Sequence, residues 1–329
     1  MAAGVRCKGR RLGACVGLIA AALLGSSCNR SGVRRIGVIP KGTAHVFWQS
    51  VHAGAEAAGR EFHEAVDWDG PANETDYARQ IEIFDSMLNQ HVTGIVVAAS
   101  DRTTLNASLD RAARENIPVV VFDSAVDSEN YVSFVATNNY EGGQMGARKL
   151  GELLHGKGSV AMIQNAPGSA STMDRERGFH DAMAKEFPGI RIVAEQYSMS
   201  DRAKGMAAAE NIFTAHPTLD GLFASSEPSS VGAAQAVKSR GLAGKVKFVG
   251  FDSSEGLVAD LQDGVIDALV AQDPFKIGYE AVKAVTDKLN GKTPPKRIDL
   301  SAVVITKADL GKPEINQLLH PDLKKYLGQ

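Results

Sequence analysis

The sequence has few cysteines, few aromatic residues and almost no net charge. Its 329 residues include three cysteines, all within the first 28 positions, so the rest of the chain has no side chain for a disulfide, a thiol nucleophile or a cysteine metal site. Aromatic residues make up 6%, and a formal net charge of −2 gives no basic surface for nucleic acid. Because 44% of the residues are hydrophobic, the chain is too apolar for disorder, and its length favours two packed domains.

The first 28 residues have the composition of an export signal. Four basic residues and no acidic residue lie before Cys28, and the apolar run from Leu12 to Leu24 is too short to span a bilayer as a stable helix. The segment resembles a bacterial lipoprotein signal, in which this cysteine is acylated and becomes the new N-terminus, although Gly25 stands where that family usually has leucine. A plain secretory signal cleaved nearby is the alternative.

Removal of residues 1–27 leaves a body of 302 residues, and its net charge falls to −6 because the four basic residues are lost with the signal. We therefore expect an acidic protein of the periplasm or cell surface, held at the membrane by a lipid anchor on Cys28.

Short apolar runs alternate with amphipathic stretches along this body, in which apolar residues recur every three to four positions as in helices. Such alternation predicts an α/β fold with parallel sheets covered by helices on both faces. Eleven strands favour two lobes of five or six strands each. The segment after Ile305 is typical of a surface tail with one short helix. The expected strands are 34–40, 64–69, 94–100, 117–123, 131–137, 159–165, 190–197, 221–226, 245–252, 265–272 and 300–306.

In open parallel sheets, ligands bind beyond the carboxyl ends of the strands, so polar residues at these ends are the candidate binding residues. For any one of them, a helix-capping role is the alternative. The candidates are Asp123, Asn138, Ser226, Glu227, Asp252 and Gln272, together with the loop KGTAHVFW after the first strand.

Seven motifs follow one another in the body: HVFWQSVHAGAEAAG, IPVVVFDS, TNNYEGGQMGARKLGELL, DRERGFHDAM, FTAHPTLDGLFASSEPSSVGAAQAV, FVGFDSSEG and ALVAQDPFKIGYEAV. Over residues 34–306, their order and spacing resemble the periplasmic sugar-binding protein family that includes the ribose, allose and galactose binders of importers driven by ATP hydrolysis. The resemblance implies two Rossmann-like lobes with three crossovers, of the periplasmic binding protein type I. We expect residues 34–137 and 273–299 in the N-terminal lobe, and residues 138–272 and 300–329 in the C-terminal lobe.

The resemblance also implies how a sugar is bound. Aromatic rings cover the apolar faces of the sugar, and planar polar groups pair with its hydroxyls. Phe47 and Trp48 lie where the family has its aromatic wall. The alternative is that both simply belong to the amphipathic helix that follows. Asp123 and Asp252 match positions that accept hydrogen bonds from hydroxyls, and Gln272 matches the family's amide.

An arginine is the remaining residue that we expect to contact the sugar. Arg177, in the motif DRERG, matches the family arginine that donates a fork of hydrogen bonds to two ring oxygens, and Arg175 is the competing candidate. The alternative is that the chosen arginine is an ordinary exposed residue of a helix.

The sequence departs from the family pattern at four candidate contacts. The family usually has asparagine in place of His45, arginine in place of Ser124, and Asn-Asp in place of Ser226 and Glu227. The missing arginine removes a bidentate donor beside Asp123. These changes argue against ribose itself and favour a different pentose, a hexose, a polyol or a glycosylated ligand.

Other classes of protein are less well supported. The loop PKGTAHVFW is not a dinucleotide-binding loop, and the chain has no phosphate loop, no G-x-S-x-G elbow and no H-E-x-x-H motif. The fragment DWDG at 67–70 begins like a calcium loop but lacks the later ligands. A ligand domain of a transcription factor would need DNA-binding helices where the signal lies. We expect no metal, no cofactor and no enzymatic activity.

The sequence therefore predicts a monomeric, extracytoplasmic solute-binding protein. It captures a monosaccharide or related polyol between two lobes and delivers the ligand to the transmembrane subunits of an ABC-type permease. A sensory sugar-binding protein that reports to a membrane receptor or kinase remains open, since both roles use lobe closure.

Overall fold

The computed structural model describes residues 1–6 and 33–328. The chain divides into two compact units, Met1–Gly32 and Val33–Gln329. Cys28 and the apolar run of the predicted signal lie outside the described residues. No helix of the described segments is both long and apolar enough to cross a membrane. Both sheets of the fold belong to the second unit.

The first sheet has six parallel strands in the order β11-β5-β4-β3-β1-β2. Both of its faces are apolar: Val96 packs on the side of α1 and α9, whereas Ile95 and Val97 pack on the side of α2 and α3. We call this sheet with these helices the N-terminal lobe. Its elements are β1 (Arg35–Ile39), α1 (Val46–Phe62), β2 (Ala65–Trp68), α2 (Tyr77–Asn89), β3 (Gly94–Val97), α3 (Asn106–Arg114), β4 (Val119–Phe122), β5 (Ser133–Thr137), α9 (Pro274–Leu289) and β11 (Arg297–Leu300).

The second sheet repeats this order as β12-β10-β9-β8-β6-β7, with only the edge strand β12 antiparallel to its neighbour. Helices α4 and α5 cover one face, and α6, α7 and α8 cover the other. This sheet with its helices is the C-terminal lobe. Its elements are α4 (Asn139–Leu153), β6 (Gly158–Gln164), α5 (Ala170–Glu186), β7 (Ile190–Tyr197), α6 (Arg202–Ala215), β8 (Gly221–Ala224), α7 (Glu227–Ser239), β9 (Lys247–Phe251), α8 (Glu255–Gln262), β10 (Ala268–Ala271) and β12 (Val303–Ile305).

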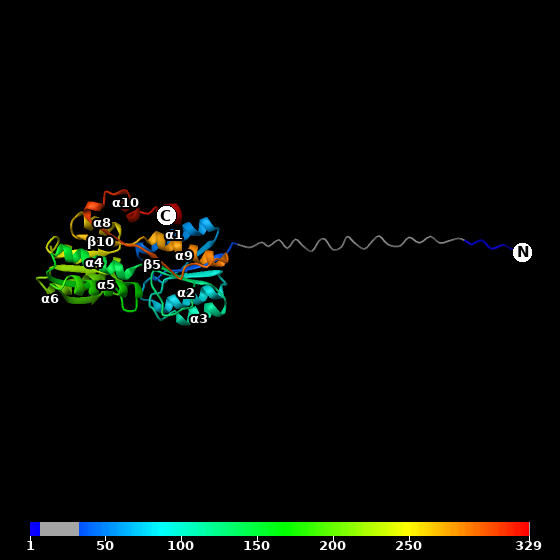
Figure 1. Ribbon diagram of the computed structural model, residues 1–329, viewed down its shortest axis with the longest axis horizontal. Helices are drawn as coiled ribbons and strands as arrows, with labels where there is room; N and C mark the ends of the chain where they lie inside the picture. The colour runs from blue at the N-terminus through cyan, green and yellow to red at the C-terminus, as the bar shows by residue number, and fades with distance from the viewer. Residues whose placement is uncertain (7–32, 329) are drawn as a thin grey trace. The chain divides into compact units, whose positions relative to one another are not determined.

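The chain passes three times between the lobes: after β5, after β10, and between β11 and β12. Figure 1 shows the N-terminal lobe in blue, cyan and orange and the C-terminal lobe in green and yellow. The predicted fold class, two doubly wound lobes of mainly parallel strands, is confirmed. The strand β11 was not predicted separately. The single strand expected at 300–306 contains the last residue of β11 and the whole of β12.

The tail also differs from the expectation. After β12 it forms a short 3-10 helix, η1 (Lys307–Asp309), and two helices, α10 (Pro313–Leu319) and α11 (Leu323–Leu327), rather than one. We expected the whole tail in the C-terminal lobe, but α11 packs against α1 of the N-terminal lobe.

The glycine-rich motif of α4 serves helix packing. A Cβ at Gly143 would lie 1.9 Å from the carbonyl oxygen of Arg175, and one at Gly178 would lie 2.0 Å from that of Tyr140. The backbones of α4 and α5 therefore touch, which only glycine permits. This close approach fixes the position of α5, which carries Arg175.

Candidate ligand-binding site

A narrow cavity lies where the carboxyl ends of the strands of both lobes meet. Its volume is only about 30 Å³, so its lining side chains are close to one another. Eight of the residues proposed from the sequence line it: His45, Phe47, Trp48, Asp123, Ser226, Glu227, Asp252 and Gln272.

Asp123 and Asp252 occupy equivalent positions in the two lobes. Asp123 follows β4 and Asp252 follows β9, the third strand in each sheet order. Both adopt the left-handed backbone conformation, with φ of 55° and 68°, which aspartate tolerates better than most residues. Strained conformations of this kind cluster at functional sites.

Asp252 is held by groups of its own lobe. Its Oδ2 accepts a hydrogen bond from the backbone N–H of Glu227 at 2.9 Å, and its Oδ1 accepts one from Gln272 Nε2 at 2.6 Å. Arg175 Nη1 lies 3.6 Å from Oδ2. Burial raises the pKa of Asp252 and outweighs the lowering effect of Arg175 and the two hydrogen bonds.

Lys41 is the partner of Asp123. It is the first residue of the loop KGTAHVFW, where the sequence did not single it out, and it is 3% exposed. Its Nζ lies 3.0 Å from Asp123 Oδ2 and donates to Ser169 Oγ at 3.2 Å and Ser171 Oγ at 3.0 Å. Because both serines belong to the C-terminal lobe, this buried ammonium group connects the two lobes.

The aromatic pair lies in the first turn of α1, whose N-terminal end faces the cavity, so both rings reach it. Trp48 is 2% exposed and packs in the core against Phe122, with ring centroids 6.2 Å apart. Phe47 is half-buried and meets Trp48 edge to face at 4.9 Å. Phe47 is therefore the more accessible of the two rings.

Glu74 fixes this wall from the loop before α2. Its Oε1 accepts a hydrogen bond from Trp48 Nε1 at 2.8 Å and lies 3.2 Å from His45 Nδ1. Although burial alone would raise the pKa of Glu74, the hydrogen bond with His45, the charge of Lys41 and the bond from Trp48 lower it to about 2. Burial lowers the pKa of His45, but the hydrogen bond and charge of Glu74 outweigh it and raise that pKa.

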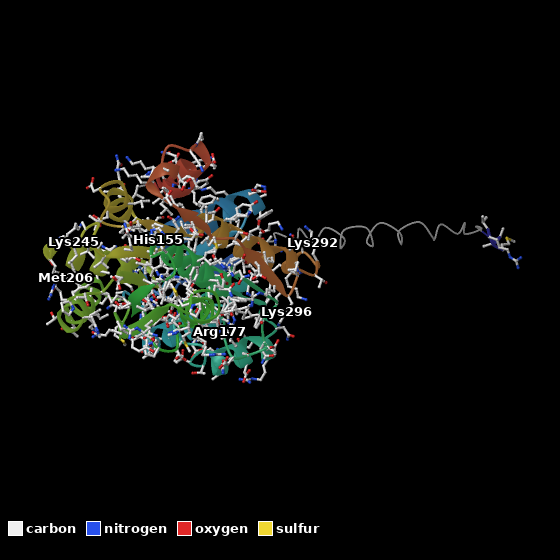
Figure 2. All side chains as sticks on the ribbon, turned by 60° about the vertical axis from the view of Figure 1, so that its left-hand side comes forward. His155, Arg177, Met206, Lys245, Lys292 and Lys296 are labelled. Atoms are coloured by element: carbon white, nitrogen blue, oxygen red, sulfur yellow. The ribbon has the colours of Figure 1, made fainter. Side chains whose placement is uncertain are left out.

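The arginine at the cavity is Arg175, not Arg177. Residues two apart on an α-helix point about 200° apart around its axis, so only one of the two faces the cavity. Arg175 is buried, donates to Asn139 Oδ1 at 2.8 Å and to the Ser225 carbonyl at 3.0 Å, and stacks on Phe251. Arg177, labelled in Figure 2, is exposed and bonds to the neighbouring Asp174 at 2.8 Å.

Ser226 and Glu227 come from the junction of β8 and α7. Ser226 Oγ donates to Asn165 Oδ1 at 3.0 Å. Glu227 is 1% exposed, and its Oε1 accepts a hydrogen bond from Arg202 Nη2 at 2.5 Å. Burial raises the pKa of Glu227 in spite of the charge of Arg202. Its second oxygen, Oε2, accepts no hydrogen bond from the described residues.

Besides Arg177, two of the predicted contacts are not brought to this cavity. Ser124 is fully buried, and its Oγ accepts a hydrogen bond from the backbone N–H of Ser171 at 3.2 Å, which links the lobes. Asn138 caps α4 by accepting from the N–H of Glu141 at 3.3 Å, as the capping alternative states. Asn138 and Arg177 line a separate cavity of about 400 Å³.

The sequence reading also left several lining residues unnamed. Lys41 and Asn165 lie at the carboxyl ends of β1 and β6, so the strand-end rule applied to every strand would have found them. Glu74 lies in a loop and carries no such signal. The full set of lining residues that were not singled out is Lys41, Glu74, Asn165, Ser171, Thr172, Ser200 and Pro228.

Comparison with known proteins decides the family. Residues 36–293 match the family described as periplasmic binding protein domain. The chain belongs to this family. The ribose import binding protein of Bacillus subtilis is 30% identical over 226 residues, which cover 68% of this chain and 72% of the relative. Membership in the periplasmic binding protein family implies a periplasmic location.

Solved structures of solute-binding proteins share this fold. One is a carbohydrate transporter solute-binding protein of Agrobacterium radiobacter in complex with D-arabinose, with a TM-score of 0.85, 32% identity and coverage of 88% of this chain and 100% of that chain. Another is an ABC transporter solute-binding protein of Agrobacterium vitis bound with α-D-tagatopyranose, with a TM-score of 0.84, 29% identity and coverage of 88% and 100%. This periplasmic binding protein is therefore similar to sugar-binding proteins of ABC importers.

Proposed function

We propose that the protein binds a neutral monosaccharide or related polyol between its two lobes and delivers it to the transmembrane subunits of an ABC-type importer. The relatives support this class of ligand, because their names and titles include ribose, D-arabinose and α-D-tagatopyranose. These sugars differ in carbon number and in the arrangement of their hydroxyls, so the shared fold does not select one of them.

The observation that carries the proposal is a set of buried, unpaired polar atoms around the cavity. In residues 33–328, eight buried side-chain oxygens lack a hydrogen-bond partner, and four belong to the lining: Asp123 Oδ2, Ser200 Oγ, Glu227 Oε2 and Gln272 Oε1. Lys41 Nζ comes within 3.0 Å of the Asp123 oxygen without a well-aligned hydrogen bond. An unpaired buried group costs about 1–3 kcal/mol, and sugar hydroxyls, which both donate and accept, satisfy such atoms.

The charges of the lining favour a neutral ligand. Lys41 and Arg175 bring two basic groups, and four carboxyl groups line the same cavity. A carboxylate or phosphate on the ligand would add negative charge beside these carboxyl groups in a poorly solvated site. Hydroxyls of a neutral sugar pair with the cations and with the carboxyl groups alike.

The geometry supports a role for each contact. Phe47 offers its ring to an apolar face of the sugar, with Trp48 behind it. Asp123 and Asp252 accept hydrogen bonds from hydroxyls on opposite sides of the ligand. Lys41 supplies the cation beside Asp123 that an arginine at the position of Ser124 would supply in the family.

Arg175 and Gln272 complete the proposed contacts in the C-terminal lobe. Arg175 replaces Arg177 as the forked donor because its guanidinium group lines the cavity beside Asp252. Gln272 Nε2 is bonded to Asp252, so its unpaired Oε1 is the atom available to a hydroxyl. Since these groups come from both lobes, a bound sugar stabilises the closed state and thereby forms the surface that a permease recognises.

We further propose that the mature protein is a monomer anchored by acylation of Cys28. The sequence before Cys28 supports the anchor, with basic residues, a short apolar run and small residues in order. Mass spectrometry of the membrane-extracted protein tests the anchor: an N-terminal lipidated cysteine is expected, and an unmodified N-terminus elsewhere would overturn it.

The sugar-binding proposal is tested with a panel of pentoses, hexoses and polyols, measured by thermal unfolding. A ligand at about 100 times its Kd adds about 2.7 kcal/mol to the free energy of unfolding, so at least one member should raise the Tm clearly. Titration calorimetry then gives the affinity of each sugar that does. If no member of the panel shifts the unfolding transition, the proposed ligand class is wrong.

A further inference from the structure

The C-terminal tail contacts both lobes. In Figure 1 the red segment runs from α10, beside α8, to a terminus marked near α1. Ile315 of α10 is 7% exposed and belongs to the hydrophobic core of the C-terminal lobe, with Leu310, Leu318 and Leu319 packed against the same core. This half of the tail is therefore anchored on the C-terminal lobe.

The last helix, α11, is anchored on the N-terminal lobe. Arg60 of α1 donates hydrogen bonds to the carbonyl oxygens of Lys325 and Tyr326 at 2.8 and 2.6 Å. Its guanidinium group lies 5.6 Å from the Tyr326 ring centroid, and the Tyr326 ring lies 5.3 Å from that of Phe275 in α9. Because a helix of five residues is not stable alone, α11 depends on this contact.

The link between the two anchors is short. Three residues, His320, Pro321 and Asp322, separate the end of α10 from the start of α11. A fully extended chain spans at most about 3.6 Å per residue, so the Cα atoms of Leu319 and Leu323 cannot separate by more than about 14 Å. A hinge motion that moves the anchors further apart must detach α11 from α1.

The same linker forms one wall of a cavity beside the proposed sugar site. This cavity has a volume of about 160 Å³, and its lining includes Phe47, Asp252 and Gln272 together with His320 and Pro321 of the tail. The tail therefore lies at the side of the sugar site as well as across the two lobes.

We infer that the tail, residues 306–328, is a strap that holds the lobes together and shifts the free protein toward the closed state. Opening the lobes costs the free energy of the α11 contact in addition to that of the contacts within the cleft. Apparent affinity depends on the fraction of protein in the binding-competent state. The strap thus changes the apparent affinity for the sugar through the fraction of closed protein and not through contacts with the sugar. This effect on affinity rests on the proposed function.

The test measures the distance between the lobes without any sugar. Since the chain after Cys28 contains no cysteine, a protein that starts at Asn29 accepts spin labels at Arg114→Cys, in α3, and Lys245→Cys, an exposed residue of the C-terminal lobe (Figure 2). Pulsed electron paramagnetic resonance then compares the parent protein with a variant that ends at Pro321.

We expect the truncated variant to show longer and broader distances than the parent. Arg60→Ala, which removes the hydrogen bonds to α11 but keeps the chain length, should shift the distribution in the same direction. Lys324→Ala is the matched control, because this side chain of α11 is exposed and makes no hydrogen bond or ion pair with the residues that the structure describes. Identical distributions in the parent, the truncated variant and Arg60→Ala would overturn the inference.

Two further measurements keep the outcomes distinct. Cooperative thermal unfolding shows that each variant is folded, and if the truncated variant fails to fold, Arg60→Ala decides. If the sugar panel identifies a ligand, its dissociation from the truncated variant should be several-fold faster. If no sugar binds, the proposed function fails, while the distance measurement still decides whether the tail is a strap.

Discussion

The carboxyl groups of Asp123 and Asp252 face the same cavity from equivalent strand ends of the two lobes, and each residue has a positive φ. Burial is the main cause that raises the pKa of Asp252, and the charge of Asp123 adds to it. Buried carboxyl groups that face one cavity are stabilised by hydrogen-bond donors placed between them. Hydroxyls of a sugar in this position donate to both.

Removal of the Asp252 charge should weaken sugar binding. Asparagine keeps the shape of the side chain and tolerates a positive φ, so Asp252→Asn should fold normally. A hydrogen bond to a charged group contributes about 1.5–3 kcal/mol, which corresponds to a loss of affinity of about 10- to 150-fold. Titration calorimetry with the sugar identified in the panel measures it. Asp201→Asn, which keeps the N-cap of α6, is the control, and equal affinities of the two variants would remove Asp252 from the site.

Lys41 should matter for stability as well as for binding. Lys41→Met keeps the length of the side chain but leaves Asp123 without the ammonium group 3.0 Å away. Loss of one partner of a buried ion pair typically costs about 3–5 kcal/mol, so we expect a lower free energy of unfolding in urea. The double variant Lys41→Met with Asp123→Asn should recover much of this loss. A double variant no more stable than Lys41→Met would show that the two residues are not coupled.

The His45–Glu74 pair predicts a pH dependence of stability. The folded protein raises the pKa of His45 above 6.5, so this contribution is complete below about pH 6.5 and is lost as the pH rises through the raised value. At acid pH the relevant group is Glu74, whose pKa is about 2 in the folded protein and 4.5 ordinarily. Its contribution to stability is therefore lost as the pH falls from about 4.5 toward 2. Urea unfolding of His45→Asn between pH 5 and 9 should lack the alkaline loss, and a profile parallel to the parent would contradict the assignment.

Glu176 predicts a second pH dependence of stability. Its cause is a buried carboxyl group rather than a histidine. It is 6% exposed, and its Oε1 accepts hydrogen bonds from the backbone N–H of Asn165 at 3.0 Å and from Ser225 Oγ at 2.9 Å. Burial raises its pKa from 4.5 to about 7 in spite of these bonds. Since the folded protein then binds a proton that the unfolded chain has released, stability falls as the pH rises from about 4.5 to about 7 and is level above that.

Glu176→Gln tests this directly, because glutamine keeps an acceptor oxygen and does not titrate. We expect the variant to be more stable than the parent by up to about 3 kcal/mol at pH 8 and to show no loss between pH 5 and 7. The free energy of unfolding in urea at several pH values gives both quantities. A parent protein whose stability is constant over this window would rule out the raised pKa.

The sequence alone determined the fold class, because short apolar runs separated by amphipathic stretches have few solutions other than parallel sheets covered by helices. It also indicated where to look for the site, since strand ends in such sheets point to ligands. Asp123, Asp252 and Gln272 follow from that rule, and the motifs led to His45, Phe47 and Trp48. Their roles in binding stay predictions until a ligand is measured.

Tertiary structure decided which of these side chains meet. Arg175 and Arg177 are indistinguishable in the motif DRERG, and only the packing of α5 on α4 turns the first toward the cavity. Lys41 meets Ser171, 130 residues away, and Arg60 meets Tyr326, 266 residues away. Local sequence patterns reflect the period of a helix or strand, whereas contacts between distant residues depend on how whole lobes and the tail pack against one another, and that arrangement is set by the complete fold.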